Sequence, residues 1–169
     1  RRNMRILGVD PGLAIVGYGL IDEGNRSIRP VHYGCIRTEA DQPVAERLEK
    51  IYHDVTVLLD EYQPDCLAVE ELFFNRNVTT AFTVGQARGV ILLAAVQRRI
   101  PVYEYTPLEV KQGVVGYGRA DKQQVQEMVQ RLLSIHQPIR PDDTADALAV
   151  ALCHAFRLPL LRHVGVWRK

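Results

Sequence analysis

The chain has 169 residues, of which 47% are apolar and 24% charged, and its 21 lysines and arginines nearly balance its 20 aspartates and glutamates. This length and composition predict one globular domain over residues 1–169 with a substantial core. We find no run of about 18 uncharged apolar residues, so we expect no membrane span. Cys35, Cys66 and Cys153 are far apart and form no CxxC pair. They predict reduced thiols in a cytoplasmic protein and exclude a disulfide framework or zinc site.

Charge is segregated along the chain. Residues 39–71 hold ten acidic and two basic side chains, whereas residues 72–141 hold nine basic and four acidic ones. From Arg157 onward the charged residues are all basic. This segregation is compatible with one face that binds a polyanion, although the near-zero net charge argues against a protein that coats nucleic acid nonspecifically.

Apolar periodicity predicts alternating strands and helices. Five segments have the pattern of strands: 5–10, 15–22, 28–38, 66–70 and 101–105. Four segments have the pattern of helices: 43–62, 78–98, 122–133 with Asp121 as N-cap, and 142–157. The first three strands follow each other closely, which predicts an antiparallel meander. The order as a whole predicts an α/β fold with a five-stranded mixed sheet and helices on both faces.

Two further stretches lack helical periodicity. The glycine-rich stretch 113–118 is expected to be a loop, and it is no P-loop because no Gly-Lys-Ser/Thr follows at the required spacing. Residues 158–169 are expected to form a mobile tail.

Asp10 closes the first apolar run, and Pro11 and Gly12 turn the chain directly after it. A carboxylate at the end of a buried strand is costly unless a cation, a donor or water meets it. On these residues alone, Asp10 is equally well explained as a turn residue that accepts a hydrogen bond from the following backbone.

Three other carboxylates favour a shared site. Glu70 ends the apolar run 66–69, while Asp143 and Asp146 are three residues apart at the start of an alanine-rich helix and therefore share one face. The carboxyl ends of parallel neighbouring strands meet at one edge of a sheet, so Asp10 and Glu70 are expected side by side. Four carboxylates from three segments predict a site for a divalent metal that prefers oxygen ligands.

Several weak motifs occur in a specific order between Arg5 and Phe156. They are Gly8-Val-Asp10-Pro-Gly12, Ala68-Val-Glu70-Glu71, Gln86-Ala-Arg88-Gly89-Val90, Val110-Lys111-Gln112 with Val114-Val115-Gly116, and Asp143-Thr-Ala-Asp146-Ala-Leu-Ala149. This ordered combination resembles the RuvC family of Holliday-junction resolvases in the RNase H-like superfamily.

The resemblance implies an RNase H-like fold, a homodimer and a crossover junction endodeoxyribonuclease that nicks two strands of like polarity in a four-way DNA junction. It implies that Asp10, Glu70, Asp143 and Asp146 are the catalytic and metal-binding residues, with two Mg²⁺ or Mn²⁺ ions per active site. Asp142, next to this set, fits better as a helix N-cap. The RuvA–RuvB branch-migration complex is the implied protein partner.

Three more residues match positions that are important in the family, and Arg76 is a further candidate for DNA binding. Lys111 and Lys122 are candidates for holding the scissile phosphate or stabilising its developing charge, although without the resemblance both are more simply solvated lysines. Phe73 matches a base-contacting aromatic, and Arg76 lies in the polar stretch that follows it. A phenylalanine at such a position otherwise belongs to the core, whereas a loop beside the site would let it stack on junction bases.

The second half of the helix predicted at 78–98 is apolar nearly all round, in residues 90–96. It is either a central core helix or, as the resemblance implies, a dimer seam in which Gly85 and Gly89 allow close approach.

Two other classes share parts of this pattern. Sugar kinases and actin-like ATPases also place an acidic residue and glycine on the first strand, but they need a second domain that 169 residues do not supply. A non-catalytic DNA-binding module would not need four converging acids.

Overall fold

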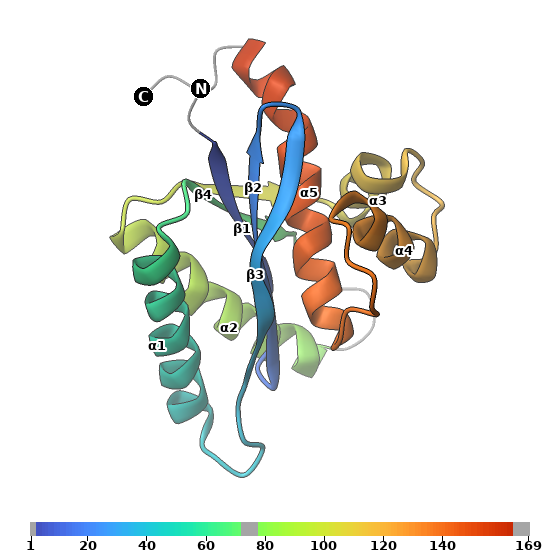
Figure 1. Ribbon diagram of the computed structural model, residues 1–169. Helices are drawn as coiled ribbons and strands as arrows, with labels where there is room; N and C mark the ends of the chain where they lie inside the picture. Colours follow the sequence, from blue (N-terminus) through green and yellow to red (C-terminus); the bar gives the residue numbers. More distant parts are fainter. Residues whose placement is uncertain (1–2, 72–77, 164–169) are drawn as a thin grey trace.

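The computed structural model describes residues 3–71 and 78–163, with side chains as far as Leu161. It contains a five-stranded sheet in the order β3-β2-β1-β4-β5 (Figure 1). The strands are β1 (Met4–Asp10), β2 (Ile15–Gly24), β3 (Ser27–Arg37), β4 (Cys66–Glu70) and β5 (Val102–Tyr105). The helices are α1 (Val44–Tyr62), α2 (Val78–Gln97), α3 (Pro107–Val115), α4 (Lys122–Leu132) and α5 (Asp142–His163).

The pairing of the strands confirms the predicted mixed sheet. β1, β2 and β3 form the antiparallel meander, while β4 runs parallel to both β1 and β5. β1 lies at the centre, and Val9 pairs with Val69, so the two parallel strands end at the same edge. We call this edge, where β1 and β4 end, the acidic edge.

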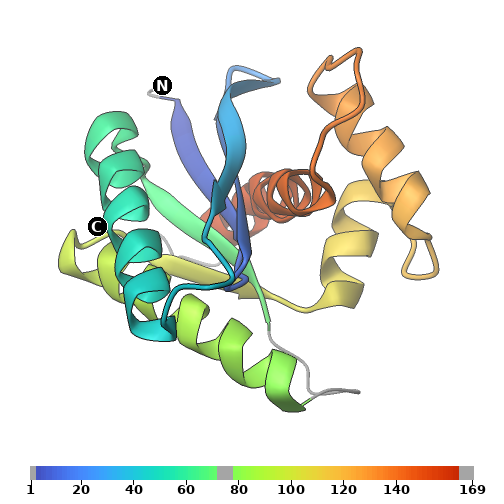
Figure 2. The same cartoon turned by 90° about the horizontal axis from the view of Figure 1, so that it is seen from below.

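Helices cover both faces of the sheet, as predicted. Viewed from below, the sheet separates α1 and α2 on one side from α5 on the other, and α3 and α4 lie beyond α5 (Figure 2). Two buried clusters match these layers. One joins the sheet to α1 and α2, and the other joins it to α3, α4 and α5.

α5 lies unusually close to the sheet because glycines line its path. A β-carbon on Gly8 would come within 2.0 Å of the Ala147 carbonyl oxygen, and one on Gly17 within 2.0 Å of the Asp143 carbonyl oxygen. The buried Thr144 hydroxyl donates a hydrogen bond of 2.8 Å to the Gly34 carbonyl. The amino end of α5 is therefore fixed on β1, β2 and β3.

The structure confirms the expected loop for residues 116–118 and corrects it for residues 113–115, which are helical. α3 covers Pro107–Val115, and only Gly116, with φ of 98°, has the left-handed conformation that ends the helix. The missed signal is a capping box in which Thr106 and Glu109 exchange hydrogen bonds, followed by a proline in the first turn.

The structure confirms that the last helix begins at residue 142, but it corrects the role of Asp142 and the far end of the helix. Asp142 is the first helical residue and not its N-cap. The helix continues to His163, with Leu158 fully buried, so the predicted tail is wrong for residues 158–163. Asp121, by contrast, caps α4 as predicted.

In the part of the chain that the structure describes, two helices, α2 and the first twenty residues of α5, are long and apolar enough to cross a membrane by length and composition alone. Core helices pass the same test, and two thirds of the α5 window is buried, against 22% of the α2 window. All three cysteines lie in the described residues and are free, with Cys66 and Cys153 buried.

The contact of α5 with Gly8 yields a stability prediction. Gly8→Ala should lower the free energy of unfolding by about 3 kcal/mol or more, because the new methyl group would overlap a backbone carbonyl that cannot rotate away. Gly24→Ala is the control, since its methyl group would meet only the exposed Asn3, whose side chain can turn aside. Urea denaturation measures both. Equal stability of Gly8→Ala and the parent would contradict this packing.

Candidate active site

The four predicted carboxylates come from three elements that meet at the acidic edge. Asp10 ends β1 and Glu70 ends β4, on neighbouring parallel strands. Asp143 and Asp146 lie in the first turns of α5, whose amino end is held over the same edge by Gly17 and the bond from Thr144. The structure thus brings together the residues that the sequence predicted to be neighbours.

Asp10 is the most perturbed of the four. Burial, followed by the charges of Asp146, Asp143 and Glu70, raises its pKa from 3.8 to about 8. A hydrogen bond with the Asp143 carboxyl acts in the same direction. Asp10 therefore holds a proton more readily than an exposed aspartate does, and such a proton, like a cation, relieves the repulsion among these acids.

Burial also raises the pKa values of Glu70 and Asp146, and the charges of nearby lysines oppose both increases. Glu70 is further raised by Asp146 and lowered by Lys111 and Lys122. For Asp146, the charge and hydrogen bond of Lys122 offset part of the burial effect. The acids are thus mutually repulsive and only partly neutralised by the chain itself.

The two lysines line the same cleft as two of the acids. Lys122 Nζ lies 3.4 Å from Asp146 Oδ2 and 3.7 Å from Asp142 Oδ2. These two carboxylates raise the pKa of Lys122 against the lowering effect of burial. The cleft has a volume of about 330 Å³, and its walls are Glu70, Pro107, Val110, Lys111, Lys122, Val125, Asp146 and Ala149.

Carboxylate oxygens are the ligands that Mg²⁺ and Mn²⁺ prefer, and buried acids whose pKa values are raised by burial and by one another fit such an ion. Within residues 3–71 and 78–163, however, no three His, Cys, Asp or Glu side chains lie close enough to hold one ion together. The donors fit a divalent metal and share one edge, but they are not drawn into one coordination sphere. The metal site therefore stays a prediction.

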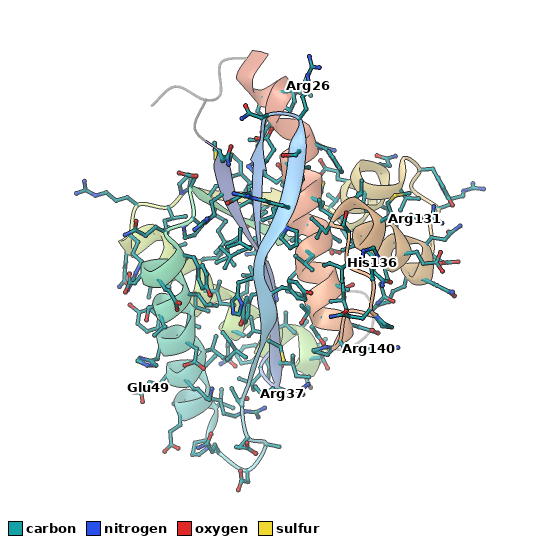
Figure 3. All side chains as sticks on the ribbon, in the orientation of Figure 1. Arg26, Arg37, Glu49, Arg131, His136 and Arg140 are labelled. Atoms are coloured by element: carbon teal, nitrogen blue, oxygen red, sulfur yellow. The ribbon has the colours of Figure 1, made fainter. Side chains whose placement is uncertain are left out.

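Phe73 and Arg76 lie outside the described residues, so their predicted roles stay predictions. The sequence patterns did not single out two exposed arginines at the acidic edge as candidates for DNA binding. Arg37 ends β3, and Arg140 precedes α5 with a side chain 76% exposed (Figure 3). The signal for Arg37 was its position at the end of a strand that runs in the same direction as β1.

Comparison with known proteins identifies the family. The family model described as crossover junction endodeoxyribonuclease RuvC matches residues 6–154. The chain belongs to the RuvC family. The crossover junction endodeoxyribonuclease RuvC of Desulfitobacterium hafniense is 60% identical over 162 residues, which cover 96% of this chain and 98% of that protein.

Solved structures agree with this assignment. Thermus thermophilus RuvC in complex with a Holliday junction substrate superposes with a TM-score of 0.89 at 38% identity, covering 93% of this chain and 96% of that one. The yeast mitochondrial Holliday junction resolvase Ydc2 has a TM-score of 0.64 at 15% identity, over 95% of this chain and 82% of its own, and supports the fold alone. The chain thus has the RNase H-like resolvase fold that its motifs predicted.

The raised pKa of Asp10 predicts a dependence of stability on pH. The folded chain binds more protons than the unfolded chain between pH 3.8 and about 8, so the ionisable Asp10 destabilises the metal-free fold increasingly as pH rises through this window. Without metal at pH 8, Asp10→Asn should therefore melt a few degrees above the parent protein. The difference should shrink toward pH 4.

Asp121→Asn provides the control for this experiment, because asparagine caps a helix as well as aspartate does and the residue is exposed. Calorimetry in the presence of a chelator gives both melting temperatures. A parent protein that melts at or above Asp10→Asn at pH 8 would contradict the burial of an unneutralised acid at position 10.

Proposed function

We propose that this chain is a crossover junction endodeoxyribonuclease that resolves four-way DNA junctions during recombination and repair, with Asp10, Glu70, Asp143 and Asp146 as its catalytic carboxylates. The observation that carries the proposal is the collection of these four acids at one sheet edge in a chain of the RuvC family. A relative that is 38% identical, Thermus thermophilus RuvC, is solved in complex with a Holliday junction substrate.

The four carboxylates would hold two Mg²⁺ or Mn²⁺ ions. When bound, such a pair lowers the pKa of the attacking water and stabilises the leaving 3′ oxygen of a phosphodiester. The chain's own contribution is the placement of the ligands. The strand ends hold Asp10 and Glu70, and α5 holds Asp143 and Asp146. As a ligand Asp10 would be ionised, so binding of an ion would oppose the rise in its pKa.

The lysines supply positive charge for the scissile phosphate. Lys122 is exposed enough to leave Asp146 for a phosphate once a metal neutralises that carboxylate, since its side chain is 58% exposed. Lys111 lines the same cleft, and its charge opposes the rise in the pKa of Glu70. Charge stabilisation of this kind is a large part of catalysis in phosphoryl transfer.

Other residues would bind the junction outside the cleft. Phe73 would stack on an unpaired base at the junction centre, and Arg76 would contact the backbone beside it. Arg37 and Arg140 are exposed at the acidic edge and would meet phosphates on either side of the site.

A homodimer would place two such active sites against two DNA strands of like polarity in the junction. α2 supports it with a stripe of exposed residues at helical spacing: Val78 (82% exposed), Phe82 (66%), Gly89, Leu93 (51%) and Val96 (63%). A β-carbon on Gly89 would meet no atom of the chain within 4 Å, so a partner helix can approach there. We also propose the RuvA–RuvB complex as a partner and the bacterial cytoplasm as the location.

The main competing function is a DNA-binding module without catalysis. Buried acids argue against it, because they repel a polyanion and destabilise the fold unless they have another use. Metal-dependent nicking of a synthetic four-way junction, with linear duplex of the same sequence as the control, separates the two functions.

The acids give the direct mutational test. Each of Asp10→Asn, Glu70→Gln, Asp143→Asn and Asp146→Asn should lower the single-turnover cleavage rate by about a thousandfold or more, because each removes one ligand charge from the shared site. Junction affinity in Ca²⁺ should stay within about threefold of the parent, because each substitution removes a negative charge that repels DNA, which offsets the loss of a metal ligand. Asp142→Asn is the matched control and should keep most activity. Any of the four that retains near-parental cleavage does not belong to the site.

The dimer gives an independent prediction. Leu93→Glu should yield a folded monomer, because this side chain is exposed in the single chain and would be desolvated in the seam. Leu92→Glu should instead lower the melting temperature, since Leu92 packs against the core under α2. Sedimentation velocity and circular dichroism distinguish the two outcomes. A parent protein that is monomeric at micromolar concentration would refute the seam.

A further inference from the structure

The two lysines of the cleft lie on α3 and α4. Over most of their length, these two helices do not contact the sheet directly. α3 and α4 lie on the far side of α5 from the strands (Figure 2). Lys111 is on α3 and Lys122 begins α4, whereas Asp10 and Glu70 are on the sheet. The distance between lysines and acids therefore depends on how α3 is fixed to α5 and to the end of β5.

A buried hydrogen bond joins β5 to α5. The Tyr105 hydroxyl and His154 Nδ1 are 2.5 Å apart, and His154 is fully buried. Burial lowers the pKa of His154 to about 4 and raises that of Tyr105, so the imidazole is neutral and the phenol keeps its proton. The two groups thus share one hydrogen bond between neutral partners. Tyr103 stacks on the same imidazole, with ring centroids 4.4 Å apart.

An ion pair then joins α5 to α3. Arg157, one turn beyond His154, places its guanidinium carbon 5.4 Å from the centre of the Tyr105 ring. Its Nη1 lies 2.6 Å from Glu109 Oε2. The other oxygen of Glu109 accepts a hydrogen bond from the Thr106 backbone, which completes the capping box that begins α3. Cys153 Sγ adds a contact of 3.4 Å to the Glu109 carbonyl.

The same network reaches the catalytic strand. Tyr105 is the register partner of Glu70, and its carbonyl accepts a hydrogen bond of 2.7 Å from the Glu71 amide. Thr106 follows it directly and starts the helix that carries Lys111. Tyr105, Glu109, His154 and Arg157 thus tie the strand end of Glu70, the start of the lysine-bearing helix and the middle of α5 to one another.

We infer that these four residues, which we call the joint, are positioning residues for the reaction. The joint fixes the position of Lys111 on α3 relative to Glu70 on β4. It also fixes both residues relative to α5, the helix that carries Asp146. None of its members lines the cleft. The inference rests on the proposed function, because it assigns the joint to the same reaction.

The Glu109–Arg157 pair allows a clean test. Glutamine at position 109 can still complete a capping box, so Glu109→Gln removes the ion pair but keeps the start of α3. Both side chains are about one third exposed, so the pair adds little to global stability. Glu109→Gln and Arg157→Gln should each lower the cleavage rate at saturating junction by about tenfold, as loss of a residue that orients a ligand does.

Further measurements separate positioning from structure. Junction affinity in Ca²⁺ should stay within about twofold, the double variant should be no slower than either single one, and Arg157→Lys should recover most of the rate. Independently of activity, amide hydrogen exchange should become faster in α3 and stay unchanged in α1 and β1. Lys50→Gln is the matched control, because it breaks an ion pair of the same 2.6 Å length with Asp54 on α1 and should change neither the rate nor α3 exchange.

Cleavage within twofold of the parent for both single variants would overturn the inference. Additive losses in the double variant, or faster exchange throughout the sheet, would also overturn it, because they indicate separate roles or general destabilisation. Failure of the proposed function looks different. In that case the parent protein itself would not cleave the junction, or Asp146→Asn would cleave it normally.

Discussion

The close contact between α5 and the glycines of β1 and β2 is the constraint on which the rest of the structure depends. Side chains larger than hydrogen at Gly8 or Gly17 would collide with the helix backbone, so the helix axis lies against the sheet at a fixed depth. That depth brings the first turns of α5 over the ends of β1 and β4. The same helix then carries α3 and α4 on its outer side, and with them both lysines (Figure 2).

As a consequence of this placement, the carboxylates at the acidic edge repel one another. Four carboxylates gather at an edge where burial alone raises the pKa values of Asp10, Glu70 and Asp146, and the lysines cancel only part of the repulsion. A fold selected for stability alone would place neutral or basic residues there. The cost is understandable if a cation binds at this edge, since neutralisation then stabilises both the site and the fold.

The sequence predicted the parts of the structure that depend on local pattern. Asp10 and Glu70 stand directly after short apolar runs, and such runs place a residue at a strand end wherever the strands lie. Lys122 against Asp146 is different, because this pairing depends on how α4 packs on α5, which no local pattern contains. α3 was missed because Gly113 suggested a loop, although Thr106 and Glu109 carried a capping signal. The last turns of α5 were missed because residues 158–169 lack a clear helical periodicity, whereas burial of Leu158 holds the helix to the core beyond residue 157.

We propose above all that the acidic edge binds divalent metal through Asp10, Glu70, Asp143 and Asp146. Anomalous diffraction from crystals grown at pH 8 with Mn²⁺ tests it most directly, because it locates the ion and its ligands without reference to activity. We predict anomalous density between these four side chains, with Lys122 displaced from Asp146. Density confined to other parts of the surface, or none under conditions in which the protein cleaves junctions, would contradict the account.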